Sequence, residues 1–217
     1  MTTRLLLVRH GETTLSAEDR FAGSTDVPLG PNGRLQAERL AARLAQDRLA
    51  AVYSSAMQRA FETAAIVARP QHLEVVRRDG LREIDHGRWE GLRRADVEAQ
   101  YPEEYAAWEE DPFTFAPSGA ESGVAVVARV LPSIREIILA HPGDDVLVVS
   151  HKATIRLILA SLLGFDARGY RDRLDQAPAS LNVLDFRTPV RARLMLFNDV
   201  SHYMAAPPRS AQRLSHW

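Results

Sequence analysis

The chain alternates short, continuous apolar runs with longer segments in which apolar residues recur at helical spacing. A continuous run predicts a strand that is buried on both faces, whereas helical spacing predicts a helix with one buried face. The predicted strands are residues 5–8, 51–53, 73–76, 146–150, 181–186 and 193–197. The predicted helices are residues 31–46, 57–68, 124–140 and 153–163.

Residues at the ends of the predicted helices support these boundaries. Gly30 and Pro31 are typical of a helix cap and of the first helical position. Ser54 and Ser55 are expected to cap the helix at 57–68, because their hydroxyls can accept hydrogen bonds from free backbone N–H groups. Gly164 is expected to end the helix at 153–163.

Strands that alternate with helices predict an α/β protein, a three-layer α/β/α sandwich with a mostly parallel central sheet. Residues 82–123 interrupt this alternation with aromatic residues, short helical patterns and loops. We therefore expect a single domain over residues 1–217 with a helical cap insertion at about 82–123, called the cap segment below. Its aromatic side chains are expected to form a core within the cap rather than an apolar pocket. They include Trp89, Tyr101, Tyr105 and Trp108. The stretch after residue 205 is expected to be a loose tail.

The composition excludes several classes of protein. Of the 217 residues, 46% are hydrophobic and 25% are charged, which is ordinary for a globular chain, and the formal net charge is −1. There is no basic run, so we expect neither nucleic acid nor membrane as a partner. Cysteine is absent, which excludes disulfides and thiolate catalysis and fits a reducing compartment. The first apolar run is too short for a secretion signal, and a cytoplasmic location is expected.

Two histidines directly follow predicted strands. His10 comes after the strand at 5–8, between Arg9 and Gly11, and His151 comes after the strand at 146–150. Ligands of parallel sheets bind beyond the carboxyl ends of the strands, so both histidines are expected at the ligand-binding edge. An imidazole that attacks an anionic ester must be neutral, and nearby guanidinium groups disfavour its protonated form. The plainer alternative for each histidine is a structural side chain.

Other charged residues also fit an anion-binding site. Arg59 lies in the first turn of the helix at 57–68, where the helix dipole disfavours a cation unless an anion is bound. The cap segment holds the carboxylates Glu83, Asp85 and Glu90, one of which could protonate a leaving oxygen. For Arg59 the plainer alternative is an arginine that points into solvent, and for the three carboxylates it is a turn with exposed charges. Three arginines of the cap segment could attract an acidic phosphoester but are interpreted as surface charges: Arg88, Arg93 and Arg94.

Taken together, these segments resemble the histidine phosphatase superfamily, also called the phosphoglycerate mutase-like family. The resemblance covers about residues 4–165, with the motifs in the order typical of the family. The matching residues are Leu7–Thr13, Gly23, Asp26–Leu29, Gly33, Gln36, Ala37, Tyr53–Ser55, Arg59, Thr63, Ala64, Leu81, Glu83, Gly87, Glu90, Gly91, Glu121, Ser122 and Val149–His151.

The resemblance implies a role for each matching polar residue at the site. His10 would be the nucleophile that becomes phosphohistidine, and Glu83 would protonate the leaving alkoxide and then deprotonate the attacking water. The phosphoryl oxygens would be bound by Arg9, Arg59 and His151. Because these cations supply the charge that magnesium supplies in other enzymes, neither a metal nor another cofactor is expected.

The chain departs from the family pattern at two positions. Many members carry Asn where this chain has Ser16, whose hydroxyl is expected to contact phosphate instead. The second strand-end histidine is followed by Lys152, the only lysine of the chain, which is expected to bind a substrate carboxylate or second phosphate. A lysine that points into solvent is the alternative. Gly23 and His202 are also expected to contact the substrate, and Asp85 is a weaker candidate for the general acid.

The predicted function is that of a metal-independent phosphomonoesterase, an acid-type phosphatase that hydrolyses a small phosphorylated metabolite through a phosphohistidine intermediate. The run at residues 87–91 favours the phosphatase branch over the alternative, a cofactor-dependent phosphoglycerate mutase. A second alternative is an inactive phosphoester-binding protein, which is disfavoured because every expected catalytic position is filled. The expected partner is a small-molecule phosphomonoester, and assembly as a homodimer is left open.

Overall fold

The computed structural model describes residues 1–18 and 20–204, so the tail expected after residue 205 lies outside the described residues. Within these ranges, six strands form one sheet in the order β3-β2-β4-β1-β5-β6. They are β1 (Thr3–Arg9), β2 (Leu49–Ser54), β3 (Val75–Arg77), β4 (Asp145–Ser150), β5 (Leu181–Thr188) and β6 (Arg191–Asp199). Strands β1 to β4 are parallel, β5 is antiparallel to β1, and β6 is antiparallel to β5. The prediction of a mostly parallel sheet is confirmed.

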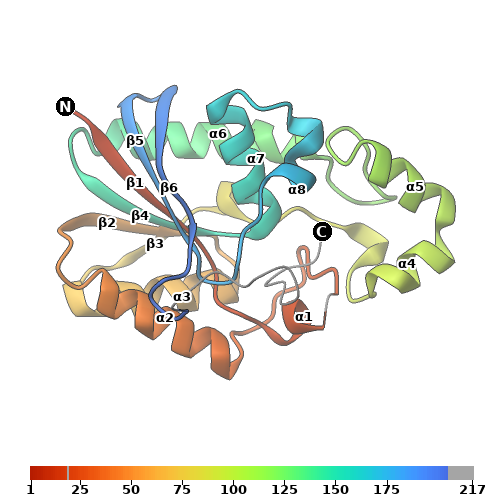
Figure 1. Ribbon diagram of the computed structural model, residues 1–217, viewed down its shortest axis with the longest axis horizontal. Helices are drawn as coiled ribbons and strands as arrows, with labels where there is room; N and C mark the ends of the chain where they lie inside the picture. The colour runs from red at the N-terminus through yellow and green to blue at the C-terminus, as the bar shows by residue number, and fades with distance from the viewer. Residues whose placement is uncertain (19, 205–217) are drawn as a thin grey trace.

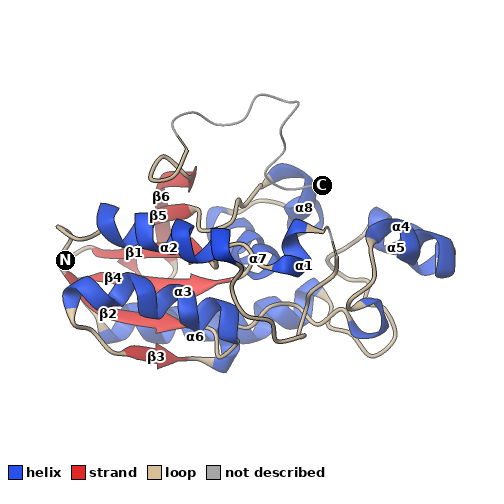
Figure 2. Ribbon diagram, turned by 90° about the horizontal axis from the view of Figure 1, so that it is seen from below, coloured by secondary structure: helices blue, strands red, loops and turns tan. Residues whose placement is uncertain are grey.

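Helices cover both faces of this sheet (Figures 1 and 2). The long helices are α2 (Pro31–Arg43), α3 (Gln58–Ala68), α6 (Gly123–Ala140) and α7 (Lys152–Leu163). Side chains of β1 alternate between the two faces, because Leu5 and Leu7 pack in the core with α6 and α7, whereas Leu6 and Val8 pack with α2 and α3. Four consecutive apolar residues thus serve two cores, and the predicted α/β/α sandwich is confirmed.

Local signals predict some helix boundaries and miss the shortest elements. Helix α2 begins at Pro31 after Gly30, and α7 ends at Gly164, whose φ of 75° lies in the left-handed region, as predicted. Five short elements are too brief to show a helical apolar period. They are α1 (Thr14–Ala17), α8 (Tyr170–Arg173) and the 3₁₀ turns η1 (Arg69–Gln71), η2 (Asp79–Leu81) and η4 (Ala167–Gly169).

The start of α3 differs from the prediction. Ser54 belongs to β2, and the residue that caps α3 is Met57. The hydroxyl of Ser55 accepts a hydrogen bond from the backbone N–H of Met57 at 3.3 Å, but the first helical residue, Gln58, donates to the carboxylate of Asp26 at 2.7 Å. The cap prediction is wrong because this carboxylate comes from a loop 32 residues earlier, which local sequence cannot reveal.

The cap segment forms a separate aromatic cluster beside the sandwich. Its regular elements are η3 (Gly87–Trp89), α4 (Arg94–Gln100) and α5 (Pro102–Glu110), which lie at one end of the molecule (Figure 1). Trp89, Val97 and Trp108 are its buried centre, and Phe21, Tyr101 and Tyr105 are among the side chains packed on it. The rings of Trp89 and Trp108 meet edge-on, with centroids 5.5 Å apart. These aromatic residues are therefore core, as the sequence indicated.

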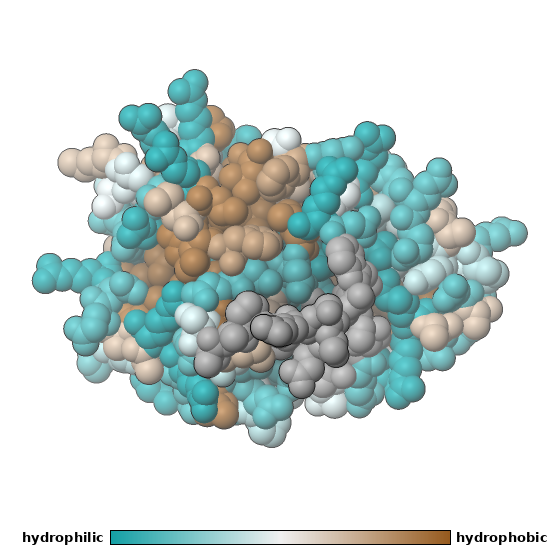
Figure 3. Space-filling view, viewed as in Figure 1, coloured by the Kyte–Doolittle hydropathy of each residue, from teal (hydrophilic) through white to brown (hydrophobic). Residues whose placement is uncertain are grey.

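The apolar surface gathers over β6 and the neighbouring part of α7, whereas the cap segment is mostly hydrophilic (Figure 3). β6 is an edge strand of the sheet, and two of its side chains, Met195 and Phe197, are exposed. Phe165, just after α7, is exposed as well. Among the helices of residues 1–18 and 20–204, none combines the length and the apolar character that crossing a bilayer requires.

Candidate active site

Four of the five predicted catalytic residues lie at the carboxyl ends of β1 and β4 and at the first turn of α3, and the fifth, Glu83, is bound to the start of α7. Arg9 ends β1 and His10 follows it, Arg59 belongs to the first turn of α3, and His151 is the residue between β4 and α7. The imidazole rings of His10 and His151 lie with centroids 5.1 Å apart, inclined by 59°. All five side chains belong to buried residues, including Glu83 from the cap segment, which is 8% exposed. The predicted juxtaposition of the two strand ends is confirmed.

The hydrogen bond of His10 fixes which ring nitrogen can react. Nδ1 lies 2.7 Å from the backbone carbonyl oxygen of Gly11. Because a carbonyl oxygen only accepts, Nδ1 must carry the hydrogen, and the neutral ring keeps its lone pair on Nε2. Burial lowers the pKa of His10 well below its ordinary value, and the charges of Arg59 and Arg9 lower it further. The imidazole is therefore neutral at pH 7.

A close approach of two backbone segments fixes the loop after His10. A Cβ atom at Gly11 would lie 2.4 Å from the carbonyl oxygen of Gly33, so only glycine fits there. The backbone N–H of Gly11 donates to Oγ1 of Thr63 at 3.1 Å, and this hydroxyl donates to the carbonyl of Arg59 at 2.8 Å. The nucleophile loop and the helix that bears Arg59 are thereby tied together.

Arg59 is oriented by the loop that precedes α2. Its two terminal nitrogens donate to the carbonyl oxygens of Thr25 and Gly23, at 2.8 and 2.7 Å. Burial lowers the pKa of Arg59, and the carboxylates of Glu83 and Asp26 oppose this shift. Gly23 was predicted as a substrate contact, and in the structure its carbonyl positions the guanidinium.

The carboxylate of Glu90 holds this loop in place. It accepts hydrogen bonds from the backbone and hydroxyl of Ser24, from the hydroxyl of Thr25 and from the backbone of His86. Burial alone would raise the pKa of Glu90, but the hydrogen bonds outweigh burial and lower it. Gly23 has a φ of +44°, and a Cβ there would lie 2.2 Å from Oε1 of Glu90. The loop is therefore specific for glycine at this position.

Arg9 is held from the other side of the site. One terminal nitrogen donates to the carbonyl oxygen of Gln176 at 2.6 Å. The Gln176 amide exchanges two hydrogen bonds with the amide of Asn182, and Asn182 also donates to the carbonyl of Leu7 in β1. Burial lowers the pKa of Arg9 to about 10, so the guanidinium stays charged at neutral pH. Gln176 and Asn182 were not predicted, because their partners Arg9 and Leu7 are 167 and 175 residues away in the chain.

Several buried nitrogens of this cluster lack a hydrogen-bond partner in the part of the chain that the structure describes. They are Nε of Arg9, Nε of Arg59 and both ring nitrogens of His151. Burial lowers the pKa of His151 well below its ordinary value, as do the charges of Arg59 and then of His10 and Arg9. Buried polar groups without partners are unfavourable in a folded protein. Nitrogens of this kind, on residues whose charges act on His10 or whose ring lies beside it, are suited to bind an anion.

Glu83 is bound to the N-terminus of α7. Oε1 accepts from the backbone of Ile84, from the backbone of Thr154 and from the Thr154 hydroxyl, each at 3.0 Å, and Oε2 accepts from the backbone of Ala153 at 3.1 Å. Glu83 therefore occupies the N–H groups of Ala153 and Thr154 at the start of the helix.

Arg129 on α6 fixes the segment that carries Glu83. Its guanidinium donates to the carbonyl oxygens of Gly80, Arg82 and Glu83 and pairs with both oxygens of Glu121. Glu121 was part of the family resemblance, but neither its partner nor its function was predicted. The arrangement makes Arg129 a positioning residue for the candidate acid.

The remaining predicted contacts lie in different surroundings. The hydroxyl of Ser16 accepts from the backbone N–H of Thr13 and donates to the Thr13 carbonyl, both at 2.9 Å, so it caps α1. Asp85 accepts from the backbone of Gly87 and shapes the turn before η3. His202 stacks edge-on against Tyr203 with centroids 4.9 Å apart, and burial with the charge of Arg43 lowers its pKa to about 4.

Lys152 is the first residue of α7 and is partly buried. Burial lowers its pKa to about 6, and the charges of Arg156 and Arg9 contribute to this shift. The lysine therefore lies close to the anion-binding cluster. Arg156 itself was not predicted, because within the helical period it could not be distinguished from a surface arginine.

The fold and the anion-binding cluster define an α/β enzyme that acts on phosphate esters. The family model of the histidine phosphatase superfamily (branch 1) matches residues 5–200, and the chain belongs to this family. The resemblance inferred from the sequence motifs is confirmed.

Two similar proteins that are named as phosphatases support the phosphatase branch. The chain is 37% identical over 163 residues to phosphoserine phosphatase 1 of Hydrogenobacter thermophilus, covering 75% of this chain and 77% of that protein. It is 36% identical over 168 residues to glucosyl-3-phosphoglycerate phosphatase of Mycobacterium tuberculosis, covering 74% of this chain and 75% of that protein. A bifunctional protein of the same organism is 39% identical over 202 residues, and the match covers 92% of this chain but 55% of that protein.

The solved structure of Bacillus stearothermophilus YhfR superimposes with a TM-score of 0.86 at 31% sequence identity, covering 92% of this chain and 98% of that chain. The chain is accordingly a phosphoric monoester hydrolase, as predicted, and these comparisons favour a phosphatase over a mutase.

Proposed function

We propose that the protein hydrolyses a small phosphorylated metabolite through a phosphohistidine intermediate on Nε2 of His10. The observation that carries this proposal is the hydrogen bond between Nδ1 of His10 and the carbonyl of Gly11. It leaves the lone pair on Nε2 of a neutral ring, beside a second imidazole and two guanidinium groups. A neutral imidazole is the form that can attack phosphorus.

The phosphoryl oxygens would be bound by the nitrogens that lack partners within the described residues, which belong to Arg9, Arg59 and His151. The two guanidinium groups carry their charge before the substrate arrives. His151 is neutral in the free protein, and a bound phosphoryl dianion raises its pKa and favours the imidazolium. The positive charge of the site thus increases when the substrate binds, which stabilises the transition state for phosphoryl transfer.

In the first step Nε2 of His10 attacks phosphorus, the N–P bond forms and the ester P–O bond breaks. Glu83 enters this step protonated and gives its proton to the leaving alkoxide. In the second step the Glu83 carboxylate takes a proton from water, the water oxygen attacks phosphorus and the N–P bond breaks. Inorganic phosphate leaves, and His10 is neutral again. Oε2 of Glu83, which accepts only from Ala153 among the described residues, is the oxygen that exchanges the proton.

The substrate class follows from the relatives and from the cap segment. Two relatives are named for phosphoserine and for glucosyl-3-phosphoglycerate, which are small phosphoesters.

We infer that residues 82–123 act as a cap within one domain, because they supply Glu83 and place the Trp108 cluster next to α8. A location in the cytoplasm, a homodimer, the absence of a nucleic-acid partner and independence from metal remain predictions.

The test is phosphate release from a panel of phosphomonoesters in the presence of a chelator, compared between the wild type and His10→Ala. The panel contains phosphoserine, 3-phosphoglycerate, sugar phosphates, nucleotides and an aryl phosphate. We expect chelator-resistant release that His10→Ala abolishes, and acid-labile phosphate on the wild-type protein after rapid quenching. His72→Asn is the matched control, since His72 is exposed and its φ of 55° suits asparagine. Release that needs a metal, or that survives in His10→Ala, would contradict the proposal.

A further inference from the structure

A second group of cationic side chains lies beside the phosphoryl-binding residues. Lys152 and Arg156 are four residues apart on α7 and therefore share one face of the helix. Arg94 comes from α4 in the cap segment. These three residues are called the second cation group below. Arg9 connects it to the phosphoryl site, because its charge acts on Lys152 and the charge of Arg156 acts on it.

Arg156 is buried although its ion-pair partner faces solvent. Its residue is 6% exposed, and one terminal nitrogen lies 3.2 Å from Asp175, whose side chain is 46% exposed. Nε of Arg156 is buried and has no hydrogen-bond partner within residues 1–18 and 20–204. Burial is the largest cause that lowers the pKa of this guanidinium. A buried guanidinium with an unused donor is unfavourable unless a ligand completes its hydrogen bonds.

Arg94 repeats this arrangement on the cap side. Its Nε is also buried without a partner among the described residues. Its terminal nitrogen reaches Glu109 at 3.5 Å, but the same Glu109 oxygen binds Arg171 more closely, at 2.7 Å. Glu109 therefore satisfies Arg171 first and leaves Arg94 with a weak contact.

The charges around Lys152 show that the group favours an added anion. After burial, the charges of Arg156 and Arg9 are the main causes that lower the pKa of Lys152 to about 6, and Arg94 adds to them. Asp175 is the carboxylate that opposes this shift. With this pKa, Lys152 is mostly uncharged at pH 7 in the free protein, and a bound anion would raise the pKa and favour the ammonium form.

We propose that the second cation group binds a second anionic group of the substrate, a carboxylate or a second phosphate, while the first phosphate lies at His10. This inference rests on the proposed function and names its substrate class: small phosphomonoesters that carry another anion. The chain's only lysine lies in this group, whereas the chain otherwise uses arginine as its basic residue. A phosphomonoester without a second anionic group occupies only the site at His10 and is the poorer substrate.

The test compares substrates that differ in one group. 3-Phosphoglycerate and glycerol 3-phosphate differ only in a carboxylate against a hydroxymethyl group, and a sugar bisphosphate is compared in parallel with its monophosphate. An aryl phosphate serves as the reference. We expect the wild type to favour the doubly anionic member of at least one pair by about tenfold or more in kcat/KM. The pair that shows the preference identifies the second anion as carboxylate or phosphate.

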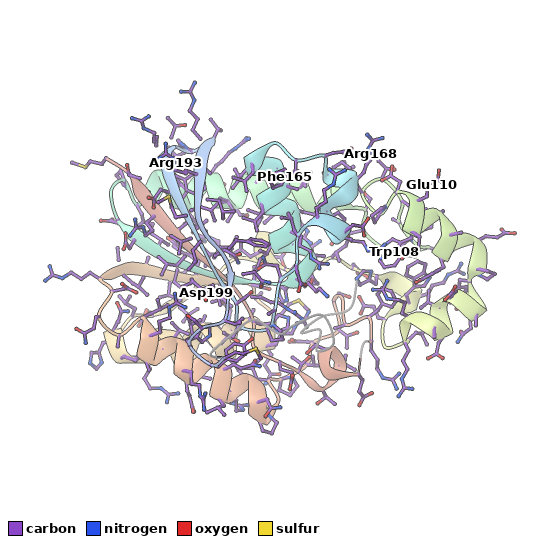
Figure 4. All side chains as sticks on the ribbon, viewed as in Figure 1. Trp108, Glu110, Phe165, Arg168, Arg193 and Asp199 are labelled. Atoms are coloured by element: carbon purple, nitrogen blue, oxygen red, sulfur yellow. The ribbon has the colours of Figure 1, made fainter. Side chains whose placement is uncertain are left out.

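Variants then assign the preference to the second cation group. In Lys152→Met and in Arg94→Gln, the ratio of kcat/KM within the preferred pair falls to about threefold or less. The matched control is Arg168→Gln, an arginine on η4 that points outward (Figure 4) and whose side chain is 66% exposed. It keeps the wild-type ratio. Thermal unfolding of each variant shows that it is folded.

Two failures are distinguishable. If the aryl phosphate is hydrolysed but the wild type treats both members of each pair alike, or if Lys152→Met keeps the preference, the second cation group does not bind substrate and the proposed function stands. If no phosphoester is hydrolysed, the proposed function is wrong. The binding of 3-phosphoglycerate and of glycerol 3-phosphate, measured by calorimetry, then tests the inference alone. Tighter binding of 3-phosphoglycerate by the wild type, with the difference lost in Lys152→Met, supports the inference. Equal binding of the two compounds by the wild type overturns it.

Discussion

The backbone N–H and the hydroxyl of Thr154 both lie 3.0 Å from the same carboxylate oxygen of Glu83. The two residues are separated by 71 positions in the chain, yet their contact places the candidate acid at the start of α7, the helix that His151 caps. The start of α7 therefore lies next to two predicted catalytic groups. His151 precedes its first residue, and its backbone N–H groups bind the carboxylate of Glu83. An error in the position of this helix would disturb both catalytic groups at once.

Replacement of Thr154 by valine should slow catalysis more than it affects substrate binding. The change removes the hydroxyl, which lies close to both Glu83 and the carbonyl of Arg82, but it keeps the shape of the side chain. We expect kcat to fall about tenfold, with KM within about threefold of the wild type, because the acid loses orientation. Thr154→Ser keeps the hydroxyl and is the control. Equal kcat values in the valine variant and the wild type would contradict this view of the carboxylate.

The pH dependence of kcat/KM should show no loss of activity near the ordinary pKa of histidine. An unperturbed imidazole would be about 90% protonated at pH 5.5 and would lose about tenfold in rate. Burial and the charges of Arg59 and Arg9 lower the pKa of His10 well below 6.5, so the reactive neutral form persists at that pH. We expect kcat/KM for an aryl phosphate, corrected for ionisation of the substrate, to change less than about threefold between pH 7 and pH 5.5. A tenfold fall over this interval would show that His10 titrates normally.

Replacement of Glu90 by glutamine should weaken phosphate binding through Arg59. Oε1 of Glu90 accepts from Ser24 and His86, and Oε2 accepts from the Thr25 hydroxyl. Glutamine keeps one accepting oxygen, but its NH2 group cannot accept from Thr25 and it carries no charge, so the loop is held less tightly. The loop carbonyls that orient Arg59 then move, and we expect KM and the inhibition constant of inorganic phosphate to rise about tenfold. The control is Glu110→Gln, an exposed carboxylate on α5 (Figure 4). An unchanged inhibition constant in Glu90→Gln would separate the loop from phosphate binding.

Replacement of Arg129 by methionine should destabilise the fold and should also lower activity. The change leaves Glu121 with Arg82 as its ion-pair partner among the described residues and removes the donor to three backbone carbonyls near Glu83. We expect the free energy of unfolding to fall by about 2–4 kcal/mol, measured by urea denaturation. Arg135→Met, at an exposed position of the same helix, should change it by less than about 0.5 kcal/mol. Similar values for both variants would contradict the structural role of the Arg129 network.

The parts of the site that sequence could predict are those fixed by neighbours in the chain. His10 and His151 each follow an apolar run that is buried on both faces, and parallel strands bring their carboxyl ends to one edge. Arg59 could be placed because the helix that carries it follows such a strand. In each case the signal and the residue are only a few positions apart.

The parts that sequence missed depend on contacts between distant segments. Arg9 is held by Gln176, 167 residues away, and Arg129 holds Glu83 across 46 residues. A single sequence contains no signal that pairs these residues. The same limitation explains the cap of α3, which Asp26 supplies from a loop, and the N–H groups of α7 that Glu83 occupies.

The position of Lys152 in the first turn of α7 has a practical consequence. Because the chain contains one lysine, growth on isotopically labelled lysine produces a protein with a single side-chain amine signal in NMR spectra. That signal comes from the first turn of α7, beside the residues that surround the phosphoryl site. Its chemical shift then reports directly on occupancy and on local protonation, without any assignment of the spectrum and without a foreign probe.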